Sequence, residues 1–138
     1  MWFLVSKKEK KKYRLINGVI KMNTVTVRDT NVPPTVDEFS EEFAGCQVAS
    51  LIDFFSGYDQ VELDERCRDM TAMMTPLGLV RQITLPQGAT NSVSQFQRVM
   101  TRILGAHIPH RAMPYLDDIG VKGPMSRYNE EEVAPRVR

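Results

Sequence analysis

"RAMPYLDDIGVKG" (residues 111–123) places two adjacent acidic residues, Asp117 and Asp118, between two short runs of mostly apolar residues. The apolar runs predict two short strands, and aspartate is well tolerated in the tight turn between them. A turn of this kind is most often solvated. Two like charges this close repel each other, however, and a bound divalent cation would relieve that repulsion. The stretch therefore predicts a hairpin, and it leaves a solvated turn and a metal-binding turn open.

A third acidic residue, Asp53, lies in the apolar run "QVASLIDFF" (residues 47–55), which predicts a buried strand. A carboxylate on a buried strand is costly unless it is paired or bound to a metal ion. A neighbouring strand of the same sheet could bring Asp53 to the Asp117–Asp118 turn. Three carboxylates without nearby His or Cys favour Mg²⁺, with Mn²⁺ as the alternative, over zinc. Such sites hold two ions in polymerases and in many nucleases, and the carboxylates alone do not separate the two classes.

The remaining pattern alternates strands and helices. Thr35 and Glu38 form a capping box ahead of an apolar helix face, and the run from Val93 to Leu104 is clearly amphipathic. The order predicts an α+β fold with helices packed on one face of an antiparallel sheet. The predicted elements before the hairpin are strands 3–7 and 12–16, helix 36–44, strand 47–55, a strand after Gly57, a helical turn over 64–69, strands 71–75 and 79–85, a loop over 85–92 and helix 93–104.

Composition and charge limit the cellular setting and the partners. The start of the chain lacks the pattern of a signal peptide, no stretch approaches the ~20 apolar residues of a membrane span, and two isolated cysteines fit a reducing compartment. We therefore expect an intracellular, cytoplasmic protein, with virus-like particles or the nucleus as alternatives, that is neither secreted nor in a membrane. The net charge of +1 hides +7 over residues 1–28 and −9 over 29–69. The basic run 7–12 either touches a polyanion or forms a solvated hairpin tip.

Three stretches resemble the reverse transcriptases of gypsy-type long-terminal-repeat retrotransposons. "YLDDIGV" resembles their catalytic YxDD hairpin, "SLIDFFSGYDQVEL" the block before it, and "TPLGLVRQITLPQGATNSVSQFQRVM" the block between them. The stretches "VPPTVDEFSEEFAGC" and "LDDIGVKGP" look most like fungal elements. The resemblance implies a right-hand polymerase fold over residues 1–123, with an antiparallel palm sheet and a partial fingers subdomain. Residues 124–138 would then be a polar tail or the start of a truncated element.

The resemblance also implies the site residues. It assigns Asp53, Asp117 and Asp118 as the catalytic triad that binds two Mg²⁺ ions, with the backbone carbonyl of Phe54 as a further ligand. Tyr58 matches a steric gate against the ribose 2′-OH, whereas the plain alternative is a core aromatic. The remaining implied contacts are Lys7 or Lys8 and Arg14 with the triphosphate, Gln87 and Gly88 with the incoming nucleotide, and Tyr115 and Leu116 with the primer.

The implied function is RNA-directed DNA polymerisation, in which a deoxynucleoside triphosphate is joined to a primer 3′-OH on an RNA or DNA template. The implied partners are that template with its primer, the nucleotides, and the thumb and RNase H regions of a longer polyprotein. The chain departs from the family at Gly18 and Ile20, where an acidic residue and an Arg are usual. Two alternatives remain: a catalytically incompetent remnant that only binds nucleic acid, and a metal-dependent nuclease, which Tyr58 and the "LPQG" stretch disfavour.

Overall fold

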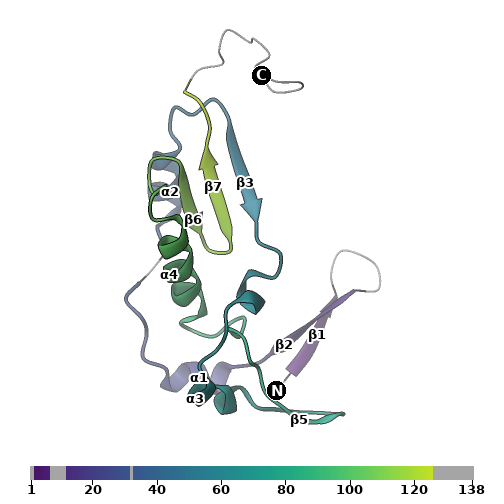
Figure 1. The fold of residues 1–138 in the computed structure, drawn as a ribbon. Helices are drawn as coiled ribbons and strands as arrows, with labels where there is room; N and C mark the ends of the chain where they lie inside the picture. Colours follow the sequence, from purple (N-terminus) through teal and green to yellow (C-terminus); the bar gives the residue numbers. More distant parts are fainter. Residues whose placement is uncertain (1, 7–11, 32, 126–138) are drawn as a thin grey trace. The chain divides into compact units, whose positions relative to one another are not determined.

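The computed structural model describes residues 2–6, 12–31 and 33–125, and Figure 1 traces them. The chain divides into two compact units. The first unit comprises Met1–Thr30 and Phe55–Phe96, and the second comprises Asn31–Phe54 and Gln97–Arg138. Within the described residues, no helix is long and apolar enough to cross a membrane.

The second unit contains the predicted hairpin in a three-stranded antiparallel sheet. The strand order is β3 (Ala49–Asp53), β7 (Asp118–Lys122) and β6 (Ala112–Tyr115), with β7 in the centre. The β6–β7 register pairs Tyr115 with Asp118, and the β3–β7 register pairs Asp53 with the same Asp118. The hairpin expected at residues 111–123 is thereby confirmed.

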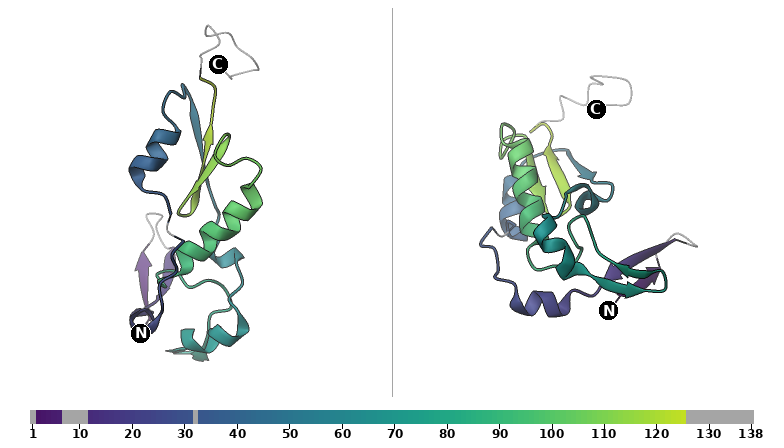
Figure 2. Two further views of the ribbon diagram at one scale, coloured as in Figure 1. Left: turned by 90° about the vertical axis from the view of Figure 1, so that its left-hand side faces the viewer. Right: turned by 60° about the horizontal axis from the view of Figure 1, so that its bottom comes forward.

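Helix α2 (Val36–Glu42) packs closely on one face of this sheet because Gly120 has no side chain there. The rings of Phe39 and Phe43 lie over that glycine, and an added Cβ atom there would overlap both of them. The ring of Phe39 also contacts Tyr115, with centroids 4.9 Å apart. Figures 1 and 2 show α2 and the second-unit part of α4 (Ser92–Leu104) on the same side of the sheet. The prediction of helices packed on one sheet face is confirmed.

The capping box that begins α2 is present as the sequence predicts. The Thr35 side chain accepts a hydrogen bond from the backbone N–H of Glu38, and the Glu38 carboxylate accepts one from the backbone N–H of Thr35 at 2.7 Å. The Thr35 backbone N–H and then the Thr35 hydroxyl, which both donate to the Glu38 carboxylate, lower the pKa of Glu38. Since two of the orphan N–H groups of the first turn are satisfied locally, the helix begins at a defined residue.

The prediction that the strand around residues 47–55 is buried is wrong. The structure has a shorter strand, β3, and all five of its residues are exposed. β3 is the edge strand of the described sheet, and the rings of α2 lie over Gly120 of the neighbouring strand. A groove of about 380 Å³ therefore remains beside Leu51, between α2 and β3.

The first unit is made of short elements around a small core. Phe96 is its most buried large side chain, and the buried Asn17 donates a hydrogen bond to the Thr71 carbonyl at 2.8 Å. The antiparallel pairs are β1 with β2 and β4 with β5. The elements are β1 (Trp2–Ser6), β2 (Tyr13–Asn17), α1 (Ile20–Val25), η1 (Gly57–Gln60), α3 (Glu65–Arg68), η2 (Asp69–Thr71), β4 (Met73–Thr75), β5 (Gly78–Val80) and the first turn of α4.

Two strand predictions in the first unit are wrong in extent, and one helix was not predicted. The residues after Gly57 form the 3₁₀ helix η1, and the strand predicted over 79–85 is only β5. The other residues of these two predicted strands form only an isolated β-bridge between Glu62 and Thr84. Backbone hydrogen bonds flank that bridge on both sides. Helix α1 lacks both a side-chain cap and a buried residue, so no capping or periodicity signal marked it.

Candidate active site

The sheet brings the three predicted catalytic aspartates to one end. Strand β3 ends at Asp53, strand β7 begins at Asp118, and these two residues are partners in the register. Asp117 lies in the turn directly before β7, and its carbonyl accepts a hydrogen bond from the N–H of Phe54 at 3.4 Å. The turn of the hairpin is thus tied by backbone to the end of the neighbouring strand.

Burial and neighbouring charge both act on the carboxyl group of Asp118. Asp53 and Asp117 are exposed, whereas Asp118 is half-buried. The pKa of Asp118 is raised, first by its partial burial and then by the negative charges of Asp117 and Asp53. Loss of water and like-charge repulsion both disfavour the ionised form of a carboxyl group. A cation bound among these groups would oppose both effects.

The donor set at this end of the sheet fits a hard divalent cation by its chemistry. It consists of carboxylate oxygens and nearby backbone carbonyls, which Mg²⁺ prefers over nitrogen and sulfur ligands. Within the described part of the chain, no group of three or more His, Cys, Asp or Glu side chains is placed so that it could hold a metal ion. The backbone register nevertheless brings Asp53 and Asp118 to one end of the sheet, with Asp117 in the adjoining turn. Mg²⁺ is often held by one or two carboxylates, with bound substrate and water completing its coordination.

The hairpin residues before the acidic pair are fixed in two ways. Tyr115 is half-buried, and its ring packs on Phe39 of α2. Leu116 adopts φ +55°, which is uncommon for a residue with a branched side chain. Such strained positions persist only where the surrounding structure holds them, and they cluster at functional sites. The two residues predicted to contact the primer therefore lie in the hairpin directly before the carboxylates.

The predicted nucleotide-selecting residues lie in the first unit. Tyr58 is half-buried in η1, and its ring contacts Phe96 with centroids 5.1 Å apart. Gln87 is half-buried in the turn ahead of α4, and Gly88 adopts φ +86°, a conformation that favours glycine. The "LPQG" motif predicted the importance of this loop. It gave no signal for Asn23 of α1, which forms two hydrogen bonds with the backbone of the loop.

The predicted triphosphate contacts are described only in part. Lys7 and Lys8 lie outside the described residues. Arg14 lies in β2 opposite Val5, but its side chain is also outside what the structure describes. The three aspartates belong to the second unit, and the residues predicted to select the nucleotide belong to the first.

Comparison with known proteins assigns the fold. The family model of the "Reverse transcriptase (RNA-dependent DNA polymerase)" matches residues 5–131. The chain is also similar to a solved foamy viral protease–reverse transcriptase in complex with double-stranded DNA. The TM-score is 0.76 at 20% identity, over 88% of this chain and 21% of that one. The predicted polymerase fold is thus confirmed.

Sequence comparison points to the same family. The chain is 34% identical over 108 residues to the retrovirus-related Pol polyprotein from transposon 297 of Drosophila melanogaster, which covers 78% of this chain and 10% of the polyprotein. It is 34% identical over 115 residues to that from transposon 412 of the same organism, with 83% and 9% covered. The chain spans about a tenth of the length of these polyproteins. The chain therefore belongs to the reverse transcriptase (RNA-dependent DNA polymerase) family.

Proposed function

We propose that residues 1–123 are the fingers–palm portion of an RNA-directed DNA polymerase, which joins a deoxynucleoside triphosphate to a primer 3′-OH on an RNA or DNA template. The observation that carries the proposal is the register pairing of Asp53 with Asp118, with Asp117 beside them, in a member of this family. The presence of all three acids at one sheet end disfavours a remnant that only binds nucleic acid.

The carboxylates of Asp53, Asp117 and Asp118, with the backbone carbonyl of Phe54, would hold two Mg²⁺ ions, and Mn²⁺ is the natural substitute. Bound there, the ions would supply Lewis acidity that lowers the pKa of the primer 3′-OH and neutralises charge on the departing pyrophosphate. The chain itself contributes the fixed spacing of its acids, because the Phe54 N–H ties the Asp117 turn to the end of β3.

The first unit would select the nucleotide. Arg14, with Lys7 or Lys8, would bind the triphosphate, since Arg forms bidentate bonds with phosphate and Lys acts as a point charge. Tyr58 would exclude a ribose 2′-OH, and its contact with the buried Phe96 restrains the ring that must do so. Gln87 would bond the sugar or base edge, and Gly88 lets the backbone come close.

In the second unit, Tyr115 and Leu116 would contact the primer end. The tilted packing of Tyr115 on Phe39 restrains that ring, and the turn conformation of Leu116 sets its direction. Both residues lie next to the carboxylates in the hairpin, so a primer end held there would face the proposed metal site.

The wider setting belongs to the same proposal. We assign the chain to a gypsy-type element inside the cell, and the likeness of two stretches to fungal elements stays a prediction. The partners would include a thumb and an RNase H region of a longer polyprotein, and the thumb would hold the template–primer duplex. Residues 124–138, most of which lie outside the described residues, would be a polar tail or lead into that next element.

Primer extension tests this function directly. The chain is incubated with poly(rA), an oligo(dT) primer, Mg²⁺ and dTTP, and extension is expected to stop when EDTA removes the metal. Asp117→Asn should abolish extension, whereas Asp37→Asn, an exposed acid on α2, should leave it unchanged. Absence of incorporation at high protein concentration, together with intact binding to the template–primer, would contradict the proposal and identify a nucleic-acid-binding remnant.

A further inference from the structure

Two asparagines in the first unit each bind the backbone of the segment that carries the other. Asn23 lies in α1, and Asn91 lies in the turn that leads into α4. The two positions are far apart in the sequence, and nothing in the proposed catalytic chemistry uses either side chain. Together they join helix α1 and the residues that follow it, up to residue 30, to the loop that carries Gln87 and Gly88.

Asn23 binds the backbone on both sides of Ala89. Its Nδ2 donates to the carbonyl of Gly88 at 2.9 Å, and its Oδ1 accepts from the N–H of Thr90 at 2.9 Å. A planar amide that donates from one end and accepts at the other fixes the relative orientation of the two peptide groups it contacts. The Gly88 carbonyl is therefore held in the direction that its left-handed backbone sets.

Asn91 makes the reciprocal pair of bonds. Its Nδ2 donates to the carbonyl of Val27 at 2.8 Å, and its Oδ1 accepts from the N–H of Asp29 at 3.0 Å. The Nε2 of Gln95, one turn further along α4, donates to the Asp29 carboxylate at 3.2 Å. The segment after α1 is thus tied to the start of α4, and it cannot move without breaking bonds from Asn91 and Gln95.

Gln87 has fixed peptide groups on both sides as a result. Before it, the carbonyl of Pro86 accepts from the Ser92 hydroxyl at 2.7 Å and from the N–H of Ala89 at 3.2 Å. After it, the Gly88 carbonyl accepts from Asn23. The backbone of the proposed nucleotide-contacting residue is therefore pinned by side chains of other elements, and the Asn23 bond is the part that comes from α1.

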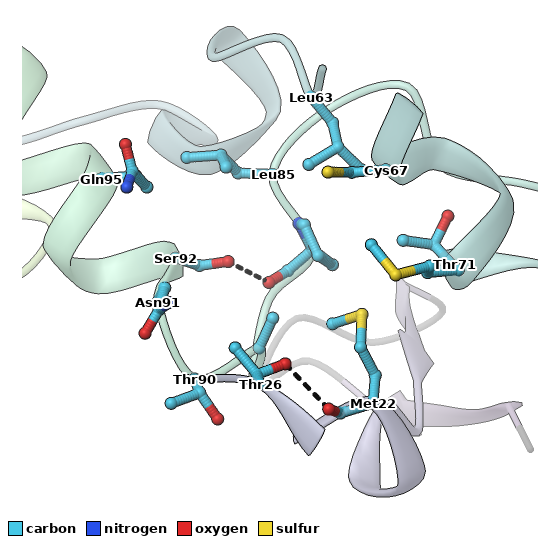
Figure 3. A pocket seen from close by; sticks show the side chains of 13 residues that line it. Met22, Thr26, Leu63, Cys67, Thr71, Leu85, Thr90, Asn91, Ser92 and Gln95 are labelled. Carbon is cyan, nitrogen blue, oxygen red and sulfur yellow. Dashed lines mark hydrogen bonds between the residues drawn. The ribbon is translucent and has the colours of Figure 1, made fainter. Parts of the chain in front are cut away.

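Packing alone does not hold this loop. A cavity of about 170 Å³ lies directly behind it, and Figure 3 shows Thr90, Asn91 and Ser92 along one wall and Met22 along another. Ala89 lines the same cavity. Where a void stands behind a segment, the dispersion contacts that would restrain it are missing. The hydrogen bonds of Asn23 and Asn91 therefore provide a restraint that packing does not.

We infer that Asn23 is a positioning residue for nucleotide selection: supported by Asn91, it holds the Gly88 peptide so that Gln87 meets the incoming nucleotide in one orientation. This inference rests on the proposed polymerase function. Asn23 acts through the loop and touches no reacting atom, so its loss should weaken nucleotide recognition more than the chemical step.

Amide hydrogen exchange measured by NMR on the full chain tests the contact without any activity. In Asn23→Leu the Thr90 amide should exchange about tenfold faster, because it loses its acceptor. Asn23→Asp keeps that acceptor but loses the donor to Gly88, so Thr90 should stay protected. In Asn91→Leu the Asp29 amide should exchange faster, because it loses the Asn91 oxygen as its acceptor. Thr24→Ala is the matched control, since among the described residues the Thr24 hydroxyl bonds only the Lys21 carbonyl of its own helix.

Steady-state extension then tests the role. Asn23→Leu and Asn23→Asp should both raise the KM for dTTP about tenfold, with kcat and the Kd for template–primer changed less than about twofold. A purely structural residue would lower the folded fraction and hence kcat, not KM.

The outcomes separate the inference from the function on which it rests. Unchanged exchange at Thr90 in Asn23→Leu would overturn the contact, and faster exchange with an unchanged KM would overturn the positioning role. If the wild-type chain extends no primer although Thr90 responds as expected, the proposed function has failed and the nucleotide role falls with it, while the Asn23 contact stands.

Discussion

Asp53 and Asp118 form the last residue pair of the β3–β7 ladder, and the backbone N–H of Phe54 bonds the Asp117 carbonyl directly beyond that pair. The separation of two acids is therefore set by strand pairing and not by flexible side-chain contacts. Because the register of a strand pair is an all-or-none property, a slip by one residue would turn Asp53 to the opposite face. The proposed metal site thus depends on the packing that keeps β3, β7 and α2 together.

Gly120 is the point at which that packing is most sensitive. Gly120→Ala would drive a Cβ into the rings of Phe39 and Phe43, so α2 must shift. Overpacking of this kind costs about 1–3 kcal/mol. Urea unfolding should show that loss, and primer extension should fall because β7 carries Asp118. Ser40→Ala, a change at an exposed α2 position, is the control, and equal stability of Gly120→Ala and wild type would contradict the packing described.

The capping box makes a separate contribution to the same unit. Thr35→Ala removes the oxygen that accepts the Glu38 N–H, and the loss of such a cap costs about 1 kcal/mol. We expect a lower urea midpoint with an unchanged m-value. Thr24→Ala again serves as a comparison because the Thr24 hydroxyl donates to the Lys21 carbonyl within α1. An unaltered midpoint in Thr35→Ala would mean that α2 does not need its cap.

Stability should fall at acidic pH in a way that can be traced to Asp64. Hydrogen bonds from Arg66, side chain first and then backbone, lower the pKa of Asp64 to about 2. A carboxyl group with a depressed pKa in the folded state stabilises that state above its unfolded pKa of about 3.9, and the contribution is lost as pH falls toward 2. In Asp64→Asn the melting temperature should depend less on pH between about 4 and 2. An identical pH profile for variant and wild type would exclude this origin.

Tyr58 offers a test of nucleotide selection that separates its two roles. Tyr58→Phe keeps the ring on Phe96, so discrimination against ribonucleotides should be retained. Tyr58→Ala removes the ring, and ribonucleotide incorporation relative to deoxynucleotide should rise about tenfold to a hundredfold. The measurement is the ratio of kcat/KM for dTTP and UTP. If Tyr58→Ala unfolds no more than Tyr58→Phe and selectivity is unchanged, Tyr58 is only a core aromatic.

Local signals predicted much of the fold. The helix expected over residues 93–104 is Ser92–Leu104, and the helix expected after Thr35 begins at Val36, because periodicity and capping are properties of neighbouring residues. The hairpin around Asp117 and Asp118 was predicted for the same reason. The exposure of β3 was not, because the apolar residues of that strand indicate burial and only the tertiary arrangement decides which strand lies at the edge.

The candidate site likewise has features that the sequence predicted and features that it did not. The triad was implied by a motif, and its placement at one end of the sheet needed the strand register. The Asn23 and Asn91 contacts could not be predicted, since each joins positions more than 60 residues apart through side-chain amides that favour no element of their own. Long-range polar contacts to backbone carry no local pattern, so only the structure reveals them.

Asp53 tests the central claim most directly, because strand pairing and not the hairpin motif brings it to the acidic pair. We compare primer extension by the wild-type chain and by Asp53→Asn on poly(rA) and oligo(dT) with Mg²⁺, after amide exchange has shown that both are folded. Loss of a carboxylate that binds the metal should lower kcat/KM about a thousandfold, while binding to template–primer persists. Extension by Asp53→Asn at the wild-type rate would contradict the assignment of this sheet end as the catalytic metal site.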